Sequence, residues 1–551
     1  MNLQEKPFYL TREENDWVEE TLRNMDDREK VGQLFCVMGN GFSEDFSEKE
    51  LDRMIKDYHV GAVLFRPLPA EKILENYRRL DALAKIPLLK AANLEEGGSG
   101  AIAEGTLYAQ PLTTAAANDV KYAGELAQVC ANEGRSVGIN WSFSPVTDIN
   151  YNFQNPITHI RSFGSDPDMV RDYSLAYIKT LQEGGIAACA KHFPGDGVDF
   201  RDHHLHPTCN SLSAEEWYAT FGRNYKAMID EGLMSFMVGH ITQPAVQMDI
   251  DPTLRIEDCL PASLSKELLK GVLREKFGFN GVICSDATIM RGFNQVMERR
   301  KGIPSAVEAG CDMLVFNVDF YEDYDYMLAG LENGILSRER LDEAVARILA
   351  LKAVTRRFTE FTERDPQNAK KSRACIERAI TLVKNLEDVF PLTPEKYPEI
   401  ILAPQGKDKG FGTQVGLADM LEEKLTAEGF RVRRFGQNVA APSKTADLAK
   451  NQLFLHVANY GADSNNTADR IYWVQPHAQD APRFINEQTE IFISFGYPFH
   501  LQDAPRIKTY INCYTCNRAA VELVVDKMMG RGEFTGVSPV DAFCGLQDTR
   551  L

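Results

Sequence analysis

The chain alternates short apolar runs with longer segments whose apolar residues recur at helical spacing. Eight apolar runs in the first two thirds are each followed by a polar or glycine-rich break and predict buried strands. These runs span residues 31–38, 61–65, 87–93, 139–146, 186–191, 235–240, 281–286 and 312–316. Segments 70–83 and 263–277 carry apolar side chains on one face, and Ser263 is the expected N-cap of the second. The pattern therefore predicts strands separated by helices.

Eight strand–helix units in roughly 350 residues are typical of a (β/α)8 TIM-like barrel with insertions. A doubly wound open sheet fits the same alternation almost as well. We expect the barrel, an α/β fold that covers residues 1–355.

The remaining third reads as a separate domain. A charged stretch without apolar periodicity, residues 359–371, predicts a linker, and a helix is expected at 374–384; together they make a connecting region, 356–395. Apolar runs alternate with helical stretches beyond it, at 400–403, 420–429, 453–457, 491–495, 509–513 and 518–529. We therefore predict a smaller parallel-sheet α/β sandwich domain at 396–551.

Composition narrows the class of partner. The net charge of −18 argues against nucleic acid or an anionic membrane surface. No apolar run approaches the roughly 18 residues that span a bilayer, and the first residues lack the pattern of a secretory signal. The cysteines are scattered and odd in number, 11 in all, which fits reduced thiols. We expect a cytoplasmic protein, with monomer or homodimer left open.

Polar residues gather where the predicted strand 186–191 ends. Residues 191–207 hold four of the ten histidines together with three aspartates. In a barrel, the ends of the strands meet at one mouth. That mouth would collect Asn93, Glu95 or Glu96, Asp148, Lys191, His192, His240 and Asp286, with Arg161 from the loop after the fourth strand. A fixed carboxylate can act as a nucleophile there, and a histidine held by an aspartate can move a proton near neutral pH.

Each of these residues also has a purely structural interpretation. Asp286 could cap the helix that follows its strand, and His192 could be a hydrogen-bonded core histidine. His204 and His206 have the spacing of one strand face and could bind a metal. Since the sequence has no second, distant cluster of cysteine and histidine, we expect no metal.

The run Lys191-His192-Phe193-Pro194-Gly195-x-Gly197, followed by Asp202-x-His204, resembles the signature of glycoside hydrolase family 3. The resemblance is to its β-N-acetylglucosaminidase branch, with an Asp–His dyad. Ser285-Asp286-x-x-x-Met290 is similar to the tip of the family's nucleophile strand. The resemblance covers about residues 20–355 and implies a barrel that needs no cofactor.

Carried over by position, the resemblance implies a role for each site residue. Asp286 would be the nucleophile, and His204, oriented by Asp202, the general acid/base. Sugar hydroxyls would be held by Arg161, Lys191, His192 and Glu95, and Met290 would line the pocket. The implied enzyme is a retaining exo-β-N-acetylhexosaminidase that acts on small glycans with a terminal N-acetylglucosamine.

Two departures from the family pattern keep alternatives open. The residue between Asp202 and His204 is usually small, but here it is His203, a rival proton donor. After the third strand, Asn93-Leu-Glu-Glu-Gly-Gly-Ser99 replaces an Asp-Gln-Glu-Gly-Gly-Arg-type run, which leaves the gripping acid ambiguous between Glu95 and Glu96 and the gluco or galacto preference undecided. The alternative functions are a phosphorylase, since a neutral histidine would not repel phosphate, a β-glucosidase of the same family, and a non-catalytic sugar-binding protein.

Overall fold

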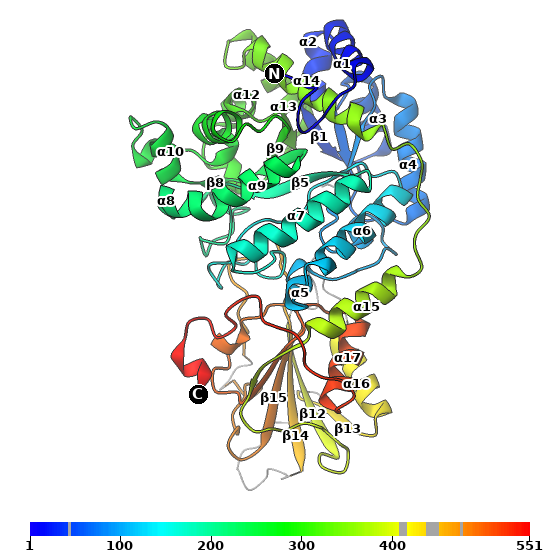
Figure 1. The fold of residues 1–551 in the computed structure, drawn as a ribbon, viewed down its shortest axis with the longest axis vertical. Coiled ribbons are helices and arrows are strands. Elements are labelled where there is room, and N and C mark those ends of the chain that lie inside the picture. The colour runs from blue at the N-terminus through cyan, green and yellow to red at the C-terminus, as the bar shows by residue number, and fades with distance from the viewer. Residues whose placement is uncertain (42–45, 407–415, 437–450, 474–477) are drawn as a thin grey trace. The chain divides into compact units, whose positions relative to one another are not determined.

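The protein divides into two compact units in a computed structural model that describes residues 1–41, 46–406, 416–436, 451–473 and 478–551 (Figure 1). The first unit comprises Met1–Tyr108, Ala123–Ile149 and Val170–Asn368. The second comprises Ala109–Tyr122, Asn150–Met169 and Ala369–Leu551. Two short segments from the first third of the chain thus group with the C-terminal residues. Among the described residues, no helix is long and apolar enough to cross a membrane.

The first unit contains the predicted barrel. Eight parallel strands close on one another in the order β1-β10-β9-β7-β5-β4-β3-β2, which excludes the open sheet. The barrel strands are β1 (Phe35–Met38), β2 (Ala62–Leu64), β3 (Leu89–Ala92), β4 (Trp141–Ser142), β5 (Ala187–Phe193), β7 (Ser235–Val238), β9 (Val282–Ala287) and β10 (Met313–Val315). All but one residue of these strands, Lys90, are buried, as expected of strands covered on both faces.

The helices lie between the strands and cover the barrel (Figure 1). They are α1 (Arg12–Asn24), α2 (Asp27–Gln33), α3 (Glu48–Asp57), α4 (Ala70–Leu83), α6 (Lys121–Ser136), α7 (Pro167–Glu183), α8 (Ala214–Trp217), α9 (Arg223–Glu231), α10 (Pro244–Ile250), α11 (Arg291–Asn294), α12 (Arg299–Ala309), α13 (Phe320–Glu332) and α14 (Arg338–Thr355). A π-helix spans Glu267–Lys276.

Two predicted boundaries in this unit were wrong. Residues 31–33 end helix α2 instead of beginning a strand, because Asp26 forms a capping box with Glu29 and starts a helix there. Ser263 is not an N-cap: its hydroxyl lies 3.0 Å from Nδ1 of His240, and the helix that follows is instead capped by the Ser265 hydroxyl, which accepts the N–H of Leu268.

A buried carboxylate, Asp312, holds the start of β10 to the helices around it. It accepts hydrogen bonds of 2.6 Å from both Arg274 and Arg340, and one of 2.8 Å from the backbone N–H of Ile283. Burial alone would raise the pKa of Asp312, but the charges of the neighbouring arginines lower it. The carboxylate is therefore ionised and is the shared counter-charge of three arginines, Arg274, Arg340 and Arg347.

Replacing Asp312 with asparagine should destabilise the first unit by about 3–5 kcal/mol, because Arg274 and Arg340 would lose their counter-charge. Denaturant unfolding at neutral pH measures the difference. The Asp312 pKa is lower in the folded state, so this contribution is lost as the pH falls below the ordinary value of 3.8 and the variant should then approach wild type. Asp342→Asn, at the exposed end of an ion pair with Lys30, is the control and should change stability by less than about 1 kcal/mol. A similarly small effect of Asp312→Asn would contradict the prediction.

The second unit is built on a six-stranded sheet in the order β11-β16-β15-β14-β12-β13. Its strands are β11 (Thr381–Asn385), β12 (Glu399–Gly406), β13 (Arg431–Arg434), β14 (Gln452–Asn459), β15 (Thr489–Ser494) and β16 (Thr509–Asn512). The strands run parallel except for β11, which pairs antiparallel with β16. The helix predicted at 374–384 ends at Ala379, and the residues after Ile380 form β11.

Among the described residues, four α-helices lie wholly or mainly in the second unit. They are α5 (Pro111–Ala116), α15 (Asn368–Ala379), α16 (Leu417–Ala427) and α17 (Arg518–Met528). Leu421 of α16 and Val524 of α17 belong to one buried core with Leu453, Ile491 and Ile511 of the strands. The smaller α/β domain with a largely parallel sheet is thus confirmed.

Candidate active site

Strand β5 ends at the barrel mouth and delivers two adjacent side chains there. In a regular strand, neighbouring residues point to opposite faces. The register of β5 against β7 shifts between Ala190 and Phe193, and such a shift breaks the alternation. His192 can then donate from Nδ1 to Asp148 Oδ2 at 2.7 Å, while Lys191 reaches residues that follow β3.

Lys191 pairs with one of the two acids that follow β3. Its Nζ lies 2.6 Å from Oε1 of Glu95 and donates to Oδ1 of Asn93 at 3.5 Å. Both Lys191 and Glu95 are largely buried, with side chains 4% and 13% exposed. The structure thus pairs Lys191 with Glu95, the residue that the sequence could not separate from Glu96.

The loop after β5 is anchored so that it returns to the mouth. It turns at Gly195, whose φ of 114° favours glycine and at which a Cβ atom would lie 2.3 Å from the ring of Phe221. Trp217 donates its indole N–H to the carbonyl of Pro194 at 2.7 Å. At the far end, β6 (Thr208–Cys209) pairs with β8 (Ile241–Thr242), which follows β7.

Asp202 and His204 form the expected dyad on this loop. The Asp202 carboxylate accepts from His204 Nδ1 at 2.6 Å and from the His204 backbone N–H at 2.8 Å. Burial would raise the pKa of Asp202, but the bond and the charge of His204 lower it. Nδ1 is therefore the protonated nitrogen, and Nε2 is left to exchange a proton. The His204 carbonyl accepts the N–H of Arg291, so the loop is also tied to α11.

Asp286 stands at the tip of β9, where its carboxylate is surrounded by donors. Oδ1 accepts the N–H of Ala287 at 2.7 Å, and Oδ2 accepts from His203 Nε2 at 3.1 Å, with His192 Nε2 3.8 Å away. Burial would raise the pKa of Asp286, but the hydrogen bond from His203 and the charge of that ring hold it well below the usual range. Met290 follows, half-buried, at the start of α11.

Three further residues complete the site, and the sequence left them without a definite role. His203 lies fully buried between Asp196 and Asp286, and Asp148 orients His192. The glycines on either side of Asp196 were the available signal, since they mark a tight turn that aims the side chain between them. His240, in contrast, bonds to Ser263 and a backbone carbonyl, and burial lowers its pKa to about 4.

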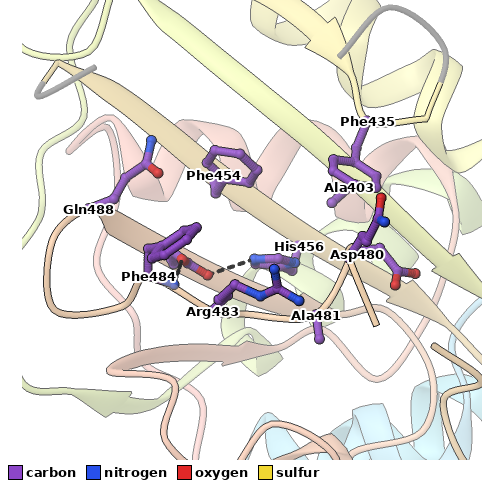
Figure 2. Close-up of a pocket in the computed structure, with 11 residues that line it drawn as sticks. Ala403, Phe435, Phe454, His456, Asp480, Ala481, Arg483, Phe484 and Gln488 are labelled. Atoms are coloured by element: carbon purple, nitrogen blue, oxygen red, sulfur yellow. Dashed lines mark hydrogen bonds and ion pairs between the residues drawn. The ribbon is translucent and has the colours of Figure 1, made fainter. Parts of the chain in front are cut away.

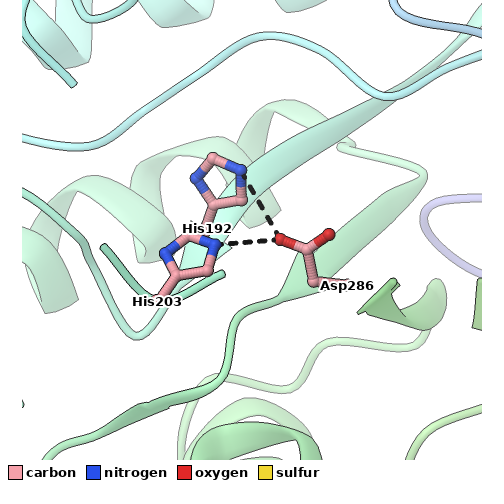
Figure 3. A group of neighbouring side chains, drawn as sticks. All are labelled: His192, His203 and Asp286. Carbon is pink, nitrogen blue, oxygen red and sulfur yellow. Dashed lines mark hydrogen bonds and ion pairs between the residues drawn. The ribbon is translucent and has the colours of Figure 1, made fainter. Parts of the chain in front are cut away.

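The side chains that could together bind a metal ion are His192, His203 and Asp286, and not the pair that the sequence spacing suggested, His204 and His206. The ring nitrogens of His192 and His203 and an oxygen of Asp286 all lie within 4.8 Å of one another, the one such group among the described residues (Figure 3). The hydrogen bond between His203 and Asp286 already occupies this space, however, and it requires a proton where the metal would bind. We therefore assign no metal to the group.

Arg161 lies in the second unit, in the loop between β4 and α7. Its backbone N–H donates to the carbonyl of Thr158 at 2.9 Å. The neighbouring His159 pairs with Asp469 of the same unit, 3.1 Å from Nε2 to Oδ2. A part for Arg161 in sugar binding stays a prediction.

The second unit also has a pocket, on the β12–β14–β15 part of its sheet (Figure 2). His456 Nε2 lies 3.0 Å from Glu490, which also accepts the N–H of Phe484, and Asp480 accepts from Gln405. These contacts join neighbouring strands and loops of the unit. None of the predicted site residues lies there.

Comparison with known proteins places this site in a family. The family described as "Glycosyl hydrolase family 3 N terminal domain" matches residues 27–351. A "Beta-N-acetylglucosaminidase/beta-glucosidase" from Cellulomonas fimi is 38% identical over the whole of both chains. A "Beta-hexosaminidase" from Neisseria meningitidis serogroup C is 30% identical over 51% of this chain and 77% of its own.

Solved structures agree with these matches. The structure "Beta-glucoside phosphorylase BglX bound to 2FGlc" is 40% identical and covers 99% of both chains with a TM-score of 0.94. A family 3 β-N-acetylglucosaminidase from Paenibacillus sp. str. FPU-7 shares the fold, with a TM-score of 0.78 at 24% identity over 95% of this chain and 100% of its own. The barrel, its mouth and the match across more than half of the sequence lead to one conclusion: the chain belongs to glycosyl hydrolase family 3.

Proposed function

We propose that this enzyme removes terminal β-linked N-acetylglucosamine or glucose from small glycosides and transfers it, with retention, to phosphate. The observation that carries the proposal is the 2.6 Å bond between Asp202 and His204, beside an ionised Asp286. Hydrolysis of a glycoside with retention of configuration ordinarily uses two carboxyl groups, one as nucleophile and one as acid. Here an imidazole takes the place of the acid.

In the first step, Asp286 attacks the anomeric carbon and the bond to the aglycone oxygen breaks. The His204 imidazolium gives its Nε2 proton to that oxygen, so the aglycone leaves as an alcohol. Asp202 stabilises the charge on the ring of His204 before the transfer and fixes its tautomer afterwards. The product is a glycosyl ester of Asp286.

In the second step, an oxygen of phosphate attacks the anomeric carbon and the ester bond breaks. His204 is now neutral and takes up the proton of the incoming group, which restores the starting state. A carboxylate in this position would repel an anionic acceptor, whereas a neutral imidazole does not. The similarity over 99% of the chain to a β-glucoside phosphorylase supports phosphate as the acceptor.

Sugar recognition falls to Lys191, Glu95 and His192. Lys191 and Glu95 are held together at 2.6 Å and can bind neighbouring hydroxyls of one ring, Lys191 as donor and Glu95 as acceptor. The curated relative that matches the whole chain has a name that covers both N-acetylglucosamine and glucose, which supports a site that accepts either. Met290 keeps its proposed place in the lining of the sugar pocket. No cofactor is needed for either step.

All eleven cysteines are free thiols, which fits the reducing conditions of the cytoplasm, where we propose that the enzyme acts. A small glycoside is its proposed partner. We leave the choice between monomer and homodimer to measurement.

The acceptor is tested by running the reaction with and without inorganic phosphate. We expect phosphate to raise the turnover of aryl β-N-acetylglucosaminides and aryl β-glucosides, and the product to be a sugar 1-phosphate in which the β configuration is kept. Sulfate, an anion of similar shape but without a transferable proton at neutral pH, is the control. The Cellulomonas fimi relative carries a hydrolase name, so free sugar as the only product, unchanged by phosphate, would assign hydrolysis instead.

A further inference from the structure

His203 is held between two carboxylates in the interior of the site. Its Nδ1 lies 2.7 Å from Oδ2 of Asp196. Its Nε2 lies 3.1 Å from Oδ2 of Asp286 (Figure 3). The ring has no exposed surface. Asp196 is itself fixed, since its backbone N–H donates to Asp148 and its Oδ1 accepts the N–H of Gly197.

This geometry determines the charge of the ring. An ionised carboxylate can only accept hydrogen bonds, and a neutral imidazole can donate only one. Both nitrogens of His203 therefore need a proton, and the ring is an imidazolium between two anions. Burial would lower the pKa of His203, but the bonds to Asp196 and Asp286 raise it well above the ordinary value.

His192 also lies near Oδ2 of Asp286, but its charge differs from that of His203. It makes one hydrogen bond, to Asp148, and its Nε2 lies 3.8 Å from Asp286, beyond bonding distance. One proton satisfies it, and burial lowers its pKa. The two histidines near Asp286 therefore differ: His203 is charged and His192 is neutral.

We propose that His203 is a positioning residue: anchored by Asp196, its imidazolium orients the nucleophile Asp286, keeps it ionised, and joins it to the acid/base His204. The proposal rests on the proposed role of Asp286 as nucleophile. It concerns a position at which the family usually carries a small residue.

The link to His204 is a ring contact. The rings of His203 and His204 are stacked, with centroids 4.7 Å apart and planes 13° from parallel. His203 thus packs against the ring of His204 from the interior and contacts Asp286 through its Nε2. When the glycosyl ester forms, Asp286 loses its charge, and the imidazolium then faces the group that must leave as a carboxylate in the second step. His203 therefore favours cleavage of the ester.

Several ionisable groups surround His203 and enter any pH profile. They are Asp196 and Asp286 at its nitrogens, His204 against its ring face, His192 and His240 at its edges, and Asp202 and Asp148 one residue further out. Of these, Asp286 alone must be ionised to attack. Removing the His203 cation should therefore raise the pKa of Asp286. The acid limb of the pH profile of kcat/KM should then move to higher pH.

The test compares His203→Gln, Asp196→Asn and His206→Gln, the last at an exposed histidine of the same loop. For His203→Gln we expect kcat/KM at neutral pH to fall by about tenfold to a hundredfold and the acid limb to rise by about one pH unit, with KM changed less than kcat. Asp196→Asn should shift the limb in the same direction by a smaller amount, and His206→Gln should leave it in place. An acid limb unmoved in His203→Gln would overturn the proposal.

A second measurement does not depend on turnover. In 15N-histidine NMR, the signals lost in His203→Gln identify this ring, and we expect both of its nitrogens to be protonated at pH 7. A neutral tautomer there would overturn the proposal, whatever the kinetics. If no glycoside is turned over by the wild type but His203 is doubly protonated, the proposed function fails while the bridge between Asp196 and Asp286 stands.

Discussion

Replacing Asp286 with alanine should lower kcat by at least about four orders of magnitude, because no glycosyl ester can form without this carboxylate. Asp286→Asn keeps the shape of the side chain and should be equally inactive, which separates loss of the nucleophile from loss of packing. Rates with an activated aryl β-N-acetylglucosaminide and with the matching β-glucoside provide the measurement. Turnover of either variant at the wild-type rate would show that another group attacks the sugar.

The same assignment can be tested by trapping. A slow 2-fluoro glycoside should leave its sugar on the wild-type enzyme, and mass spectrometry of the digested protein should place it on a peptide containing residues 281–290. Thermal unfolding of the variants confirms that they fold. A label on any other carboxylate, such as Asp196 or Glu95, would contradict the assignment.

Replacing His204 with alanine should have a large effect that depends on the aglycone. Natural glycosides have poor leaving groups and need the proton, so their kcat/KM should fall by about a thousandfold. An aryl glycoside whose phenol leaves without help should form the glycosyl ester almost normally. The measurement is therefore kcat/KM against the pKa of the leaving group, and the variant should show a much steeper dependence than the wild type.

The controls for His204 come from the same loop. Asp202→Asn should reproduce part of the defect, because the tautomer of His204 is no longer fixed by a carboxylate. His206→Ala, at an exposed histidine, should behave as wild type. If His203→Gln rather than His204→Ala gave the steep leaving-group dependence, the proton donor would be His203.

The sequence was sufficient for features that depend on repetition or on a rigid motif. The spacing of the apolar runs predicted the eight barrel strands, because each buried strand must be separated from the next by an amphipathic helix. The contact between Asp202 and His204 was implied by the family resemblance, and it forms within three residues of the chain, because the Asp202 carboxylate reaches both N–H groups of His204. Such contacts depend on local geometry alone.

Contacts that depend on a turn or a register shift could not be predicted from the sequence. The bond between His203 and Asp196 requires the chain to reverse at Gly195 and Gly197, and nothing in the composition of the loop states which side chain then faces inward. The choice of Glu95 over Glu96 depends on where a loop leaves β3. Helix ends were misplaced where a short cap, as at Asp26, outweighed the apolar pattern of the residues after it.

The pairing of β6 with β8 has a consequence for substrate affinity. The loop that carries Asp202 and His204 is closed at one end by β5 and at the other by this two-stranded sheet. Ordering a free loop around each incoming sugar would cost conformational entropy at every turnover. In this protein the loop is already ordered when the chain has folded. The binding energy of the sugar therefore remains available to stabilise the transition state. Short glycosides with few contacts beyond one ring should then still be turned over efficiently.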